Sequence, residues 1–156
     1  MIGLIAAAVA LTHLTKLFLP AMVARGRGRV LNVASTAAFQ PGPMMAVYYA
    51  SKAYVLSFSE ALREELRGSG VTVTTLCPGP TETDFQKTAG IERIRLLKIT
   101  NMNAGKVAKL GYRGLAAGRG IVVTGLLNRL LAFGVRFAPR SLILWMVHQV
   151  QVKTRR

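Results

Sequence analysis

Two short strand-like runs enclose one long helical pattern, and this order constrains the fold more than any other feature of the sequence. Residues 29–34 and 71–77 are typical of strands, and residues 46–67 between them are typical of a helix that begins after a proline-containing loop. The run 71–77 is β-branched and apolar, which indicates a strand buried on both faces. The sequence therefore predicts a layered α/β fold.

Tyr48 and Lys52 are four residues apart on this helix, and Ser35 follows the first strand. Side chains at that spacing lie on one helix face, about one turn apart. Because an ammonium favours a neighbouring phenolate, we expect Lys52 to lower the pKa of Tyr48 from its usual value of about 10. Ser35 could then polarise a carbonyl that Tyr48 protonates. Alternatively, Ser35 closes a turn as a local cap, and we interpret Tyr49 as a packing residue.

Three segments match one pattern in order and spacing: the strand ending in Ser35, Tyr48-x-x-x-Lys52, and the strand 71–77 followed by Pro78-Gly79-x-x-x-Thr83. Together they closely resemble the short-chain dehydrogenase/reductase family. The resemblance is specific from about residue 12 to residue 83 and looser over residues 103–125. It implies the C-terminal half of a Rossmann-like, doubly wound parallel sheet in three α/β/α layers.

The resemblance also implies an NAD(P)-dependent oxidoreductase that reduces a carbonyl or oxidises a secondary alcohol on a lipophilic substrate. Ser35, Tyr48 and Lys52 would be its catalytic residues. The residues expected to bind the cofactor, which is NAD or NADP without distinction, are Tyr48, Lys52, Pro78, Gly79, Thr81 and Thr83. The alternative is a truncated, non-catalytic remnant that binds a membrane surface or a partner chain.

Two departures from the family pattern stand out. The glycine-rich turn that approaches the cofactor pyrophosphate is absent before residue 1, and Gly114, Gly118 and Gly120 precede an apolar run instead of following a strand. We interpret these glycines as turn and cap residues. The family's proton-relay Asn is also missing, with Ala7 near that point. We therefore expect the second half of a dinucleotide-binding domain, with open strand edges and poor solubility on its own.

Composition limits the remaining classes of function. The 156 residues are 51% hydrophobic and 17% charged, which excludes a disordered chain. The single cysteine, Cys77, excludes an internal disulfide and a cysteine zinc cluster, and we expect it to be a packed thiol. His13 and His148 are far apart in sequence and lack carboxylates at ligand spacing, so we expect no metal site.

The net charge of +15 is concentrated in residues 88–156, which hold thirteen Lys and Arg against one acidic residue. Such asymmetry is typical of proteins that bind nucleic acid, an anionic membrane or phosphate-bearing ligands, and also of a solvated basic face. Nucleic acid is the weakest of these partners, because aliphatic residues interleave with the basic ones and no recognition motif accompanies them. We expect no nucleic acid partner.

Residues 3–24 are expected to form a core helix, because no basic residue precedes them as in a signal peptide. Their uncharged run before Lys16 is shorter than a membrane-spanning helix requires. Residues 84–100 show no clear periodicity and correspond to a substrate lid in the family. Asn101 or Asn103 is expected to cap a helix that reaches Ala117, and residues 121–123 form a last short strand.

Residues 125–150 are expected to be helical, with a break at Pro139. Arg129, Arg136 and Arg140 would fall within about 40° of one another on one helix. That pattern suits a helix on a membrane surface, and the alternative is a helix packed on the substrate pocket or on another subunit. We therefore predict one partial domain, 1–156, with a catalytic core portion (1–124) and an apolar, basic extension (125–156). A cytoplasmic or membrane-associated homo-oligomer is expected if the protein is complete.

Overall fold

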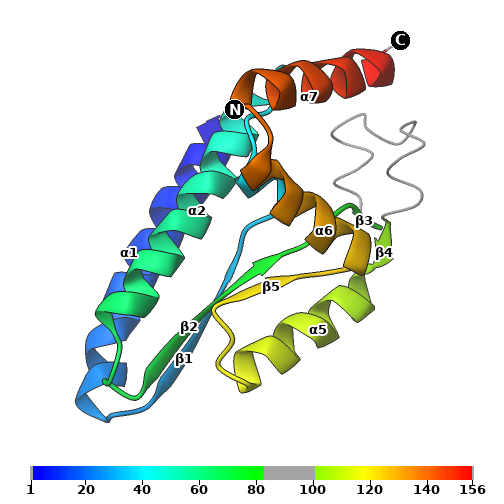
Figure 1. Ribbon diagram of the computed structural model, residues 1–156. Helices are drawn as coiled ribbons and strands as arrows, with labels where there is room; N and C mark the ends of the chain where they lie inside the picture. Colours follow the sequence, from blue (N-terminus) through cyan, green and yellow to red (C-terminus); the bar gives the residue numbers. More distant parts are fainter. Residues whose placement is uncertain (1, 83–100, 156) are drawn as a thin grey trace.

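The computed structural model describes residues 2–82 and 101–155 and places helices on both sides of a small sheet (Figure 1). The predictions for residues 84–100 lie outside the described residues. The elements, in chain order, are α1 (Ile2–Ala24), β1 (Gly28–Val33), the 3-10 helix η1 (Thr36–Phe39), α2 (Ala46–Glu65), β2 (Val71–Cys77), β3 (Thr81–Glu82), β4 (Met102–Asn103), α5 (Ala104–Ala116), β5 (Ile121–Val123), α6 (Leu126–Gly134), the 3-10 helix η2 (Val135–Phe137) and α7 (Arg140–Arg155).

The main sheet is parallel, with the strand order β1-β2-β5. In the β1–β2 ladder Gly28 pairs with Val71 and Val33 with Leu76, while Thr75–Cys77 pairs with Ile121–Val123 in the other ladder. Parallel neighbours require a crossover connection. Helix α2 crosses between β1 and β2, and α5 crosses between β2 and β5. The short strands β3 and β4 form a separate parallel pair.

Helices cover both faces of this sheet, which confirms the three-layer α/β/α arrangement (Figure 1). On one face, Asn32 of β1 donates a hydrogen bond to Ser59 of α2 at 2.9 Å, and both side chains are buried. On the other face, α5 approaches the strands at two glycines. A Cβ atom at Gly111 would lie 2.7 Å from Leu76, and one at Gly114 would clash with Val122. The glycines therefore permit close packing between α5 and the sheet.

The core lies around β2, the central strand. Val73 and Cys77 are fully buried. Cys77 belongs to a cluster with Ala34, Val55 and Leu56, which come from the segment after β1 and from α2. The expectation of a packed thiol is confirmed, and so is a strand over residues 71–77 that is buried along most of its length.

Helix α1 packs along α2 and β1 but leaves much of its apolar surface exposed. The hydroxyls of Thr12 and Tyr54 form a hydrogen bond of 2.8 Å between α1 and α2. The window Gly3–Ala24 has a mean hydropathy of 1.6 and is 11% buried, so α1 is long and apolar enough to span a membrane. The expectation that it is too short is wrong, because the helix continues past Lys16. Core helices of soluble proteins and signal sequences reach the same length and hydropathy.

The C-terminal helical region is divided differently from the prediction. The chain leaves the α-helix at Gly134, forms η2, and begins α7 after Pro139. Arg129, Arg136 and Arg140 consequently lie on three different elements. Their expected grouping within 40° is wrong, because that angle applies only along one continuous α-helix.

Candidate active site

The candidate site lies at the carboxyl ends of the parallel strands, where open α/β sheets usually bind ligands. Ser35 follows β1, and Pro78 and Gly79 follow β2. Helix α2 begins near the same end and carries Tyr48 in its first turn and Lys52 one turn later. Thus three segments that are separate in sequence meet at one edge of the sheet.

Ser35 is held at the start of η1 by bonds on both sides. Its Oγ accepts a hydrogen bond from the backbone N–H of Ala37 at 3.1 Å, so it caps the 3-10 helix. The same hydroxyl lies 3.4 Å from the carbonyl oxygen of Pro78, to which it donates. It also forms a side-chain hydrogen bond with Tyr48. Ser35 thus acts as the local cap that was given as the alternative, and the same hydroxyl also meets the phenol of Tyr48.

Lys52 completes the group from the next turn of α2. Its Nζ is 5.9 Å from the centroid of the Tyr48 ring and donates a hydrogen bond of 3.3 Å to the carbonyl oxygen of Val33, the last residue of β1. The structure thus brings Ser35, Tyr48 and Lys52 together around the end of β1.

Burial dominates the electrostatics of this group. It raises the pKa of Tyr48 above 10.0, and the hydrogen bond with Ser35 offsets part of that rise. Burial also lowers the pKa of Lys52 below 10.5. The expectation of a lowered Tyr48 pKa is wrong in its net direction, because the loss of water around the phenol outweighs the groups beside it, and Lys52 donates to a backbone carbonyl. At neutral pH Tyr48 is therefore a protonated phenol, the form that donates a proton.

The loop after β2 closes one side of the site. The carbonyl oxygen of Pro78 accepts a hydrogen bond of 2.8 Å from the backbone N–H of Thr36, which ties this loop to η1. Thr81 donates from Oγ1 to the carbonyl oxygen of Gly79 at 3.0 Å. Pro78 is thus placed beside Ser35, and Gly79 and Thr81 follow it in the chain, whereas Thr83 lies outside the described residues.

Two buried polar side chains at this end of the molecule were not predicted from the sequence. Asn128 of α6 packs against Gly79, where a Cβ atom would clash with its amide, and it donates to the carbonyl oxygen of Thr124 at 2.9 Å. Gln151 of α7 lies 3.4 Å from the hydroxyl of Tyr49. The sequence signal available was an amide residue within a largely apolar helix. The sequence does not show that these amides are buried.

The site fits the nicotinamide ribose end of a dinucleotide cofactor. An ammonium has three donors, and Lys52 uses one on Val33, so its other donors suit ribose hydroxyls. The glycines at the end of α5 offer no pyrophosphate turn, because they precede β5 and Gly118 adopts a positive φ of 62° after the helix. This agrees with the interpretation of Gly118 as a cap residue. The same interpretation is wrong for Gly114, which lies inside α5 and packs against Val122.

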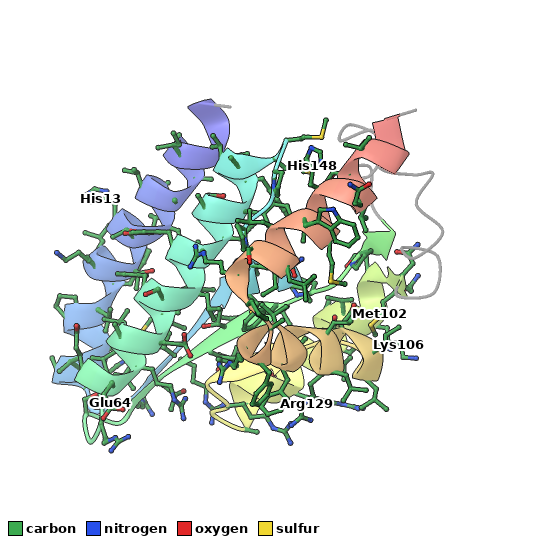
Figure 2. The ribbon with its side chains drawn as sticks, turned by 45° about the horizontal axis from the view of Figure 1, so that its top comes forward. His13, Glu64, Met102, Lys106, Arg129 and His148 are labelled. Atoms are coloured by element: carbon green, nitrogen blue, oxygen red, sulfur yellow. The ribbon has the colours of Figure 1, made fainter. Side chains whose placement is uncertain are left out.

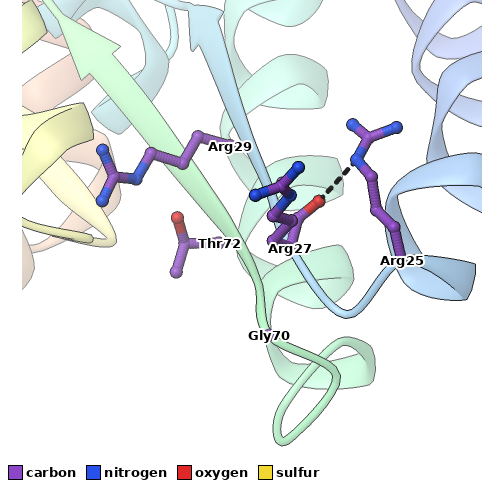
Figure 3. A pocket seen from close by; sticks show the side chains of 6 residues that line it. Arg25, Arg27, Arg29, Gly70 and Thr72 are labelled. Atoms are coloured by element: carbon purple, nitrogen blue, oxygen red, sulfur yellow. Dashed lines mark hydrogen bonds between the residues drawn. The ribbon is translucent and has the colours of Figure 1, made fainter.

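A hollow of about 480 Å³ lies at the opposite end of the strands (Figure 3). Arg25, Arg27, Arg29 and Thr72 contribute to its wall. The Nε of Arg25 donates to the carbonyl oxygen of Arg27 at 2.9 Å, which orders the turn before β1. Because this hollow adjoins the amino ends of β1 and β2, it is separate from the site around Ser35.

We expect the thiol of Cys77 to react slowly in the folded protein. Burial raises its pKa from 9.0 to about 12, and a backbone hydrogen bond from Ser35 offsets part of that rise. At pH 8 a thiol reagent should label the folded chain at least about a hundredfold more slowly than the urea-unfolded chain. The raised pKa favours the folded state fully below pH 9, and this contribution should be lost as the pH rises toward 12. Equal labelling rates would contradict the buried position.

Comparison with known proteins agrees with this geometry. Residues 6–93 match the family described as short chain dehydrogenase. Over 71 residues the chain is 44% identical to the ketoacyl reductase HetN of a Nostoc species, covering 46% of this chain and 25% of that protein. It is 39% identical to a very-long-chain 3-oxoacyl-CoA reductase of Bos taurus over 71 residues, covering 46% and 23%.

The fold also matches solved structures. A short chain dehydrogenase from Burkholderia cenocepacia, crystallised in complex with NADP, superimposes with a TM-score of 0.67 at 26% sequence identity. The superposition covers 85% of this chain and 52% of that one. The chain thus corresponds to about half the length of this solved relative.

Proposed function

Because the chain belongs to the short chain dehydrogenase family, we propose that it is the catalytic portion of an NAD(P)-dependent oxidoreductase that interconverts a carbonyl and a secondary alcohol. The convergence of Ser35, Tyr48 and Lys52 at the end of β1 carries this proposal. The two relatives described above are named as ketoacyl and 3-oxoacyl-CoA reductases. We therefore favour a lipophilic 3-oxoacyl compound as the substrate.

In the reduction, the Ser35 hydroxyl exchanges its 3.4 Å hydrogen bond to Pro78 for one to the substrate carbonyl oxygen, and so stabilises the negative charge that develops there. The nicotinamide cofactor, when bound, supplies the hydride that reaches the carbonyl carbon. Tyr48 transfers its phenolic proton to the oxygen, which completes the alcohol and leaves a phenolate. The Lys52 ammonium, 5.9 Å from the Tyr48 ring centroid, stabilises that phenolate.

Two of the catalytic residues and the loop after β2 hold the cofactor in this proposal. Lys52 and Tyr48 would contact the ribose, while Pro78, Gly79 and Thr81 support the nicotinamide, together with Thr83. Residues 1–124 would act as the catalytic core portion of a single partial domain, 1–156, and residues 125–156 as an extension. We further propose that the protein is a cytoplasmic homo-oligomer.

Cofactor binding tests the proposal without a known substrate. NADH and NADPH should each be titrated into the chain while the nicotinamide fluorescence is followed. Lys52→Met should weaken binding at least about tenfold, since it removes charge-assisted hydrogen bonds. Lys16→Met, an exposed lysine on α1, is the matched control and should leave the affinity unchanged. Absence of binding at millimolar cofactor would favour the non-catalytic remnant instead.

A second candidate function is peripheral contact with a membrane through residues 125–156. Exposed apolar side chains on α6, η2 and α7 favour it, among them Leu126, Phe137 and Trp145. This contact is compatible with the oxidoreductase proposal, because a lipophilic substrate would be drawn from the same membrane.

A further inference from the structure

Helix α6 presents an apolar ridge to solvent. Leu126, Leu130 and Phe133 are between 59% and 75% exposed, and at 100° per residue they lie within about 60° of one another on the helix. Phe137 of η2, which is 75% exposed, extends the row. Its ring packs edge-on against that of Phe133, with the centroids 5.1 Å apart. We call Leu126, Leu130, Phe133 and Phe137 the α6 ridge.

The opposite face of α6 is anchored to the candidate active site. Asn128 and Ala132 are buried there. Asn128 donates to the carbonyl oxygen of Thr124 and packs against Gly79 in the loop after β2. Rotating the ridge inward would expose this amide contact and push large side chains against Gly79. The α6 ridge is therefore held outward, directly behind a loop of the site.

Basic residues accompany the ridge without acidic ones. Arg129, Arg136 and Arg140 are exposed, and Figure 2 locates Arg129 on α6. The sequence has no Asp or Glu after Glu92, and no carboxylate in the described part of the chain pairs with these arginines. Apolar side chains flanked by unpaired cations are the chemistry that binds an anionic lipid surface.

We propose that the α6 ridge inserts into the interface of an anionic phospholipid bilayer, with Arg129, Arg136 and Arg140 at the headgroups. This inference deepens the membrane contact of the proposed function and names its lipid and its residues. A second copy of the chain is a poorer occupant, because it carries the same net charge of +15 and the same arginines. A convex row of Leu and Phe also needs no matching pocket in a fluid interface.

Helix α1 provides a matched control surface. Leu14, Leu17 and Phe18 are between 52% and 63% exposed, comparable to the ridge. The only Lys or Arg within α1 is Lys16, so this face lacks the charge that would favour anionic lipid. Apolar exposure alone would make both surfaces bind, whereas the proposal requires binding through α6.

The test is flotation of the full chain with phosphatidylcholine vesicles that contain or lack phosphatidylserine. Trp145, the only tryptophan, is 61% exposed on α7 and serves as a fluorescence reporter. The chain should float with phosphatidylserine vesicles and its Trp145 emission should shift to shorter wavelength. Leu126→Ser/Leu130→Ser/Phe133→Ser should lower the partition coefficient at least about tenfold. Leu14→Ser/Leu17→Ser/Phe18→Ser should leave it unchanged.

The arginines have their own variant. Arg129→Gln/Arg136→Gln/Arg140→Gln should weaken binding to phosphatidylserine vesicles at least about tenfold, and added salt should do the same to the parent chain. Circular dichroism checks that every variant is folded. If the triple ridge variant is unfolded, the single substitution Leu130→Ser is tested instead and should weaken binding in the same direction by a smaller factor.

Equal flotation of the ridge variant and the parent chain would overturn the proposal, and so would a loss confined to the α1 variant. Equal binding to neutral vesicles would overturn the anionic lipid as the partner. Self-association through the ridge without vesicle binding would assign the surface to a second copy instead. Flotation needs no cofactor, so a chain that floats but binds no nicotinamide would refute only the oxidoreductase proposal.

Discussion

Replacement of Tyr48 by phenylalanine is expected to lower the rate of carbonyl reduction by about 10²- to 10⁴-fold, the usual contribution of a positioned general acid. The change removes the hydroxyl that bonds to Ser35 and leaves the ring beside Lys52. Tyr48→Phe also removes one proposed ribose contact, but the ring and the Lys52 contact stay, so cofactor affinity should change far less than the rate. The loss should therefore appear in kcat rather than in KM. The reaction is measured by the change in nicotinamide absorbance, with a 3-oxoacyl thioester as substrate and a protein preparation that has been shown to bind the cofactor.

Tyr49→Phe is the matched control for this prediction. Its hydroxyl is also partly buried and accepts a hydrogen bond from Gln151 at 3.4 Å, but Ser35 bonds to Tyr48. Its ring packs against Gly42 and meets the Tyr48 ring edge-on. We expect Tyr49→Phe to keep the rate within about threefold of the parent, since it loses only hydrogen bonds with Gln151 and Gln40 and none with Ser35. A large loss of rate in Tyr49→Phe together with an active Tyr48→Phe would show that Tyr49, and not Tyr48, is the general acid.

Two strands were predictable because their side chains are mostly β-branched or apolar. Residues 71–77 and 121–123 are strands in the structure with the predicted bounds, since β-branched apolar runs between glycine-rich turns have few alternatives. The helix predicted over 46–67 ends at Glu65, because Leu66 already turns toward Gly68. The pair β3 and β4 was not predicted, as each strand has only two residues and depends on its partner.

The members of the candidate site were predictable, but their electrostatics were not. Tyr48 and Lys52 are brought together by helical spacing alone, and Ser35 by its place after a strand. The direction in which the Tyr48 pKa shifts depends on the burial of its phenol, which is known only from the folded structure. Asn128 and Gln151 reach this end of the molecule through the packing of α6 and α7, which no local pattern encodes.

The same limit explains the C-terminal region. Pro139 predicted a break in the helix, but η2 begins four residues earlier, so Arg129, Arg136 and Arg140 lie on separate elements. The apolar side chains of α6 still follow helical spacing, so the α6 ridge was encoded in the sequence. Its direction was not, because the buried Asn128 and the exposed Leu126 could be told apart only in the structure.

Replacement of Gly70 by alanine is expected to lower the free energy of unfolding by roughly 3 kcal/mol or more. Gly70 has a φ of 77°, a conformation that L residues adopt at a cost. A Cβ atom there would also clash with the carbonyl group of Gly26, whose carbon would be 2.7 Å away. The turns before β1 and β2 pack backbone to backbone at this point (Figure 3), so neither can yield by rotating a side chain.

Gly68, in the same turn, separates the two causes of this loss. Its φ is 83°, but a Cβ atom there would meet nothing within 4 Å. Gly68→Ala should therefore cost only the conformational strain, about 1 kcal/mol, and urea unfolding followed by circular dichroism measures both variants. Similar losses for the two alanines would show that the turns do not touch as described. A Gly70→Ala loss at least twice that of Gly68→Ala would show that contact between the turns fixes the amino ends of β1 and β2.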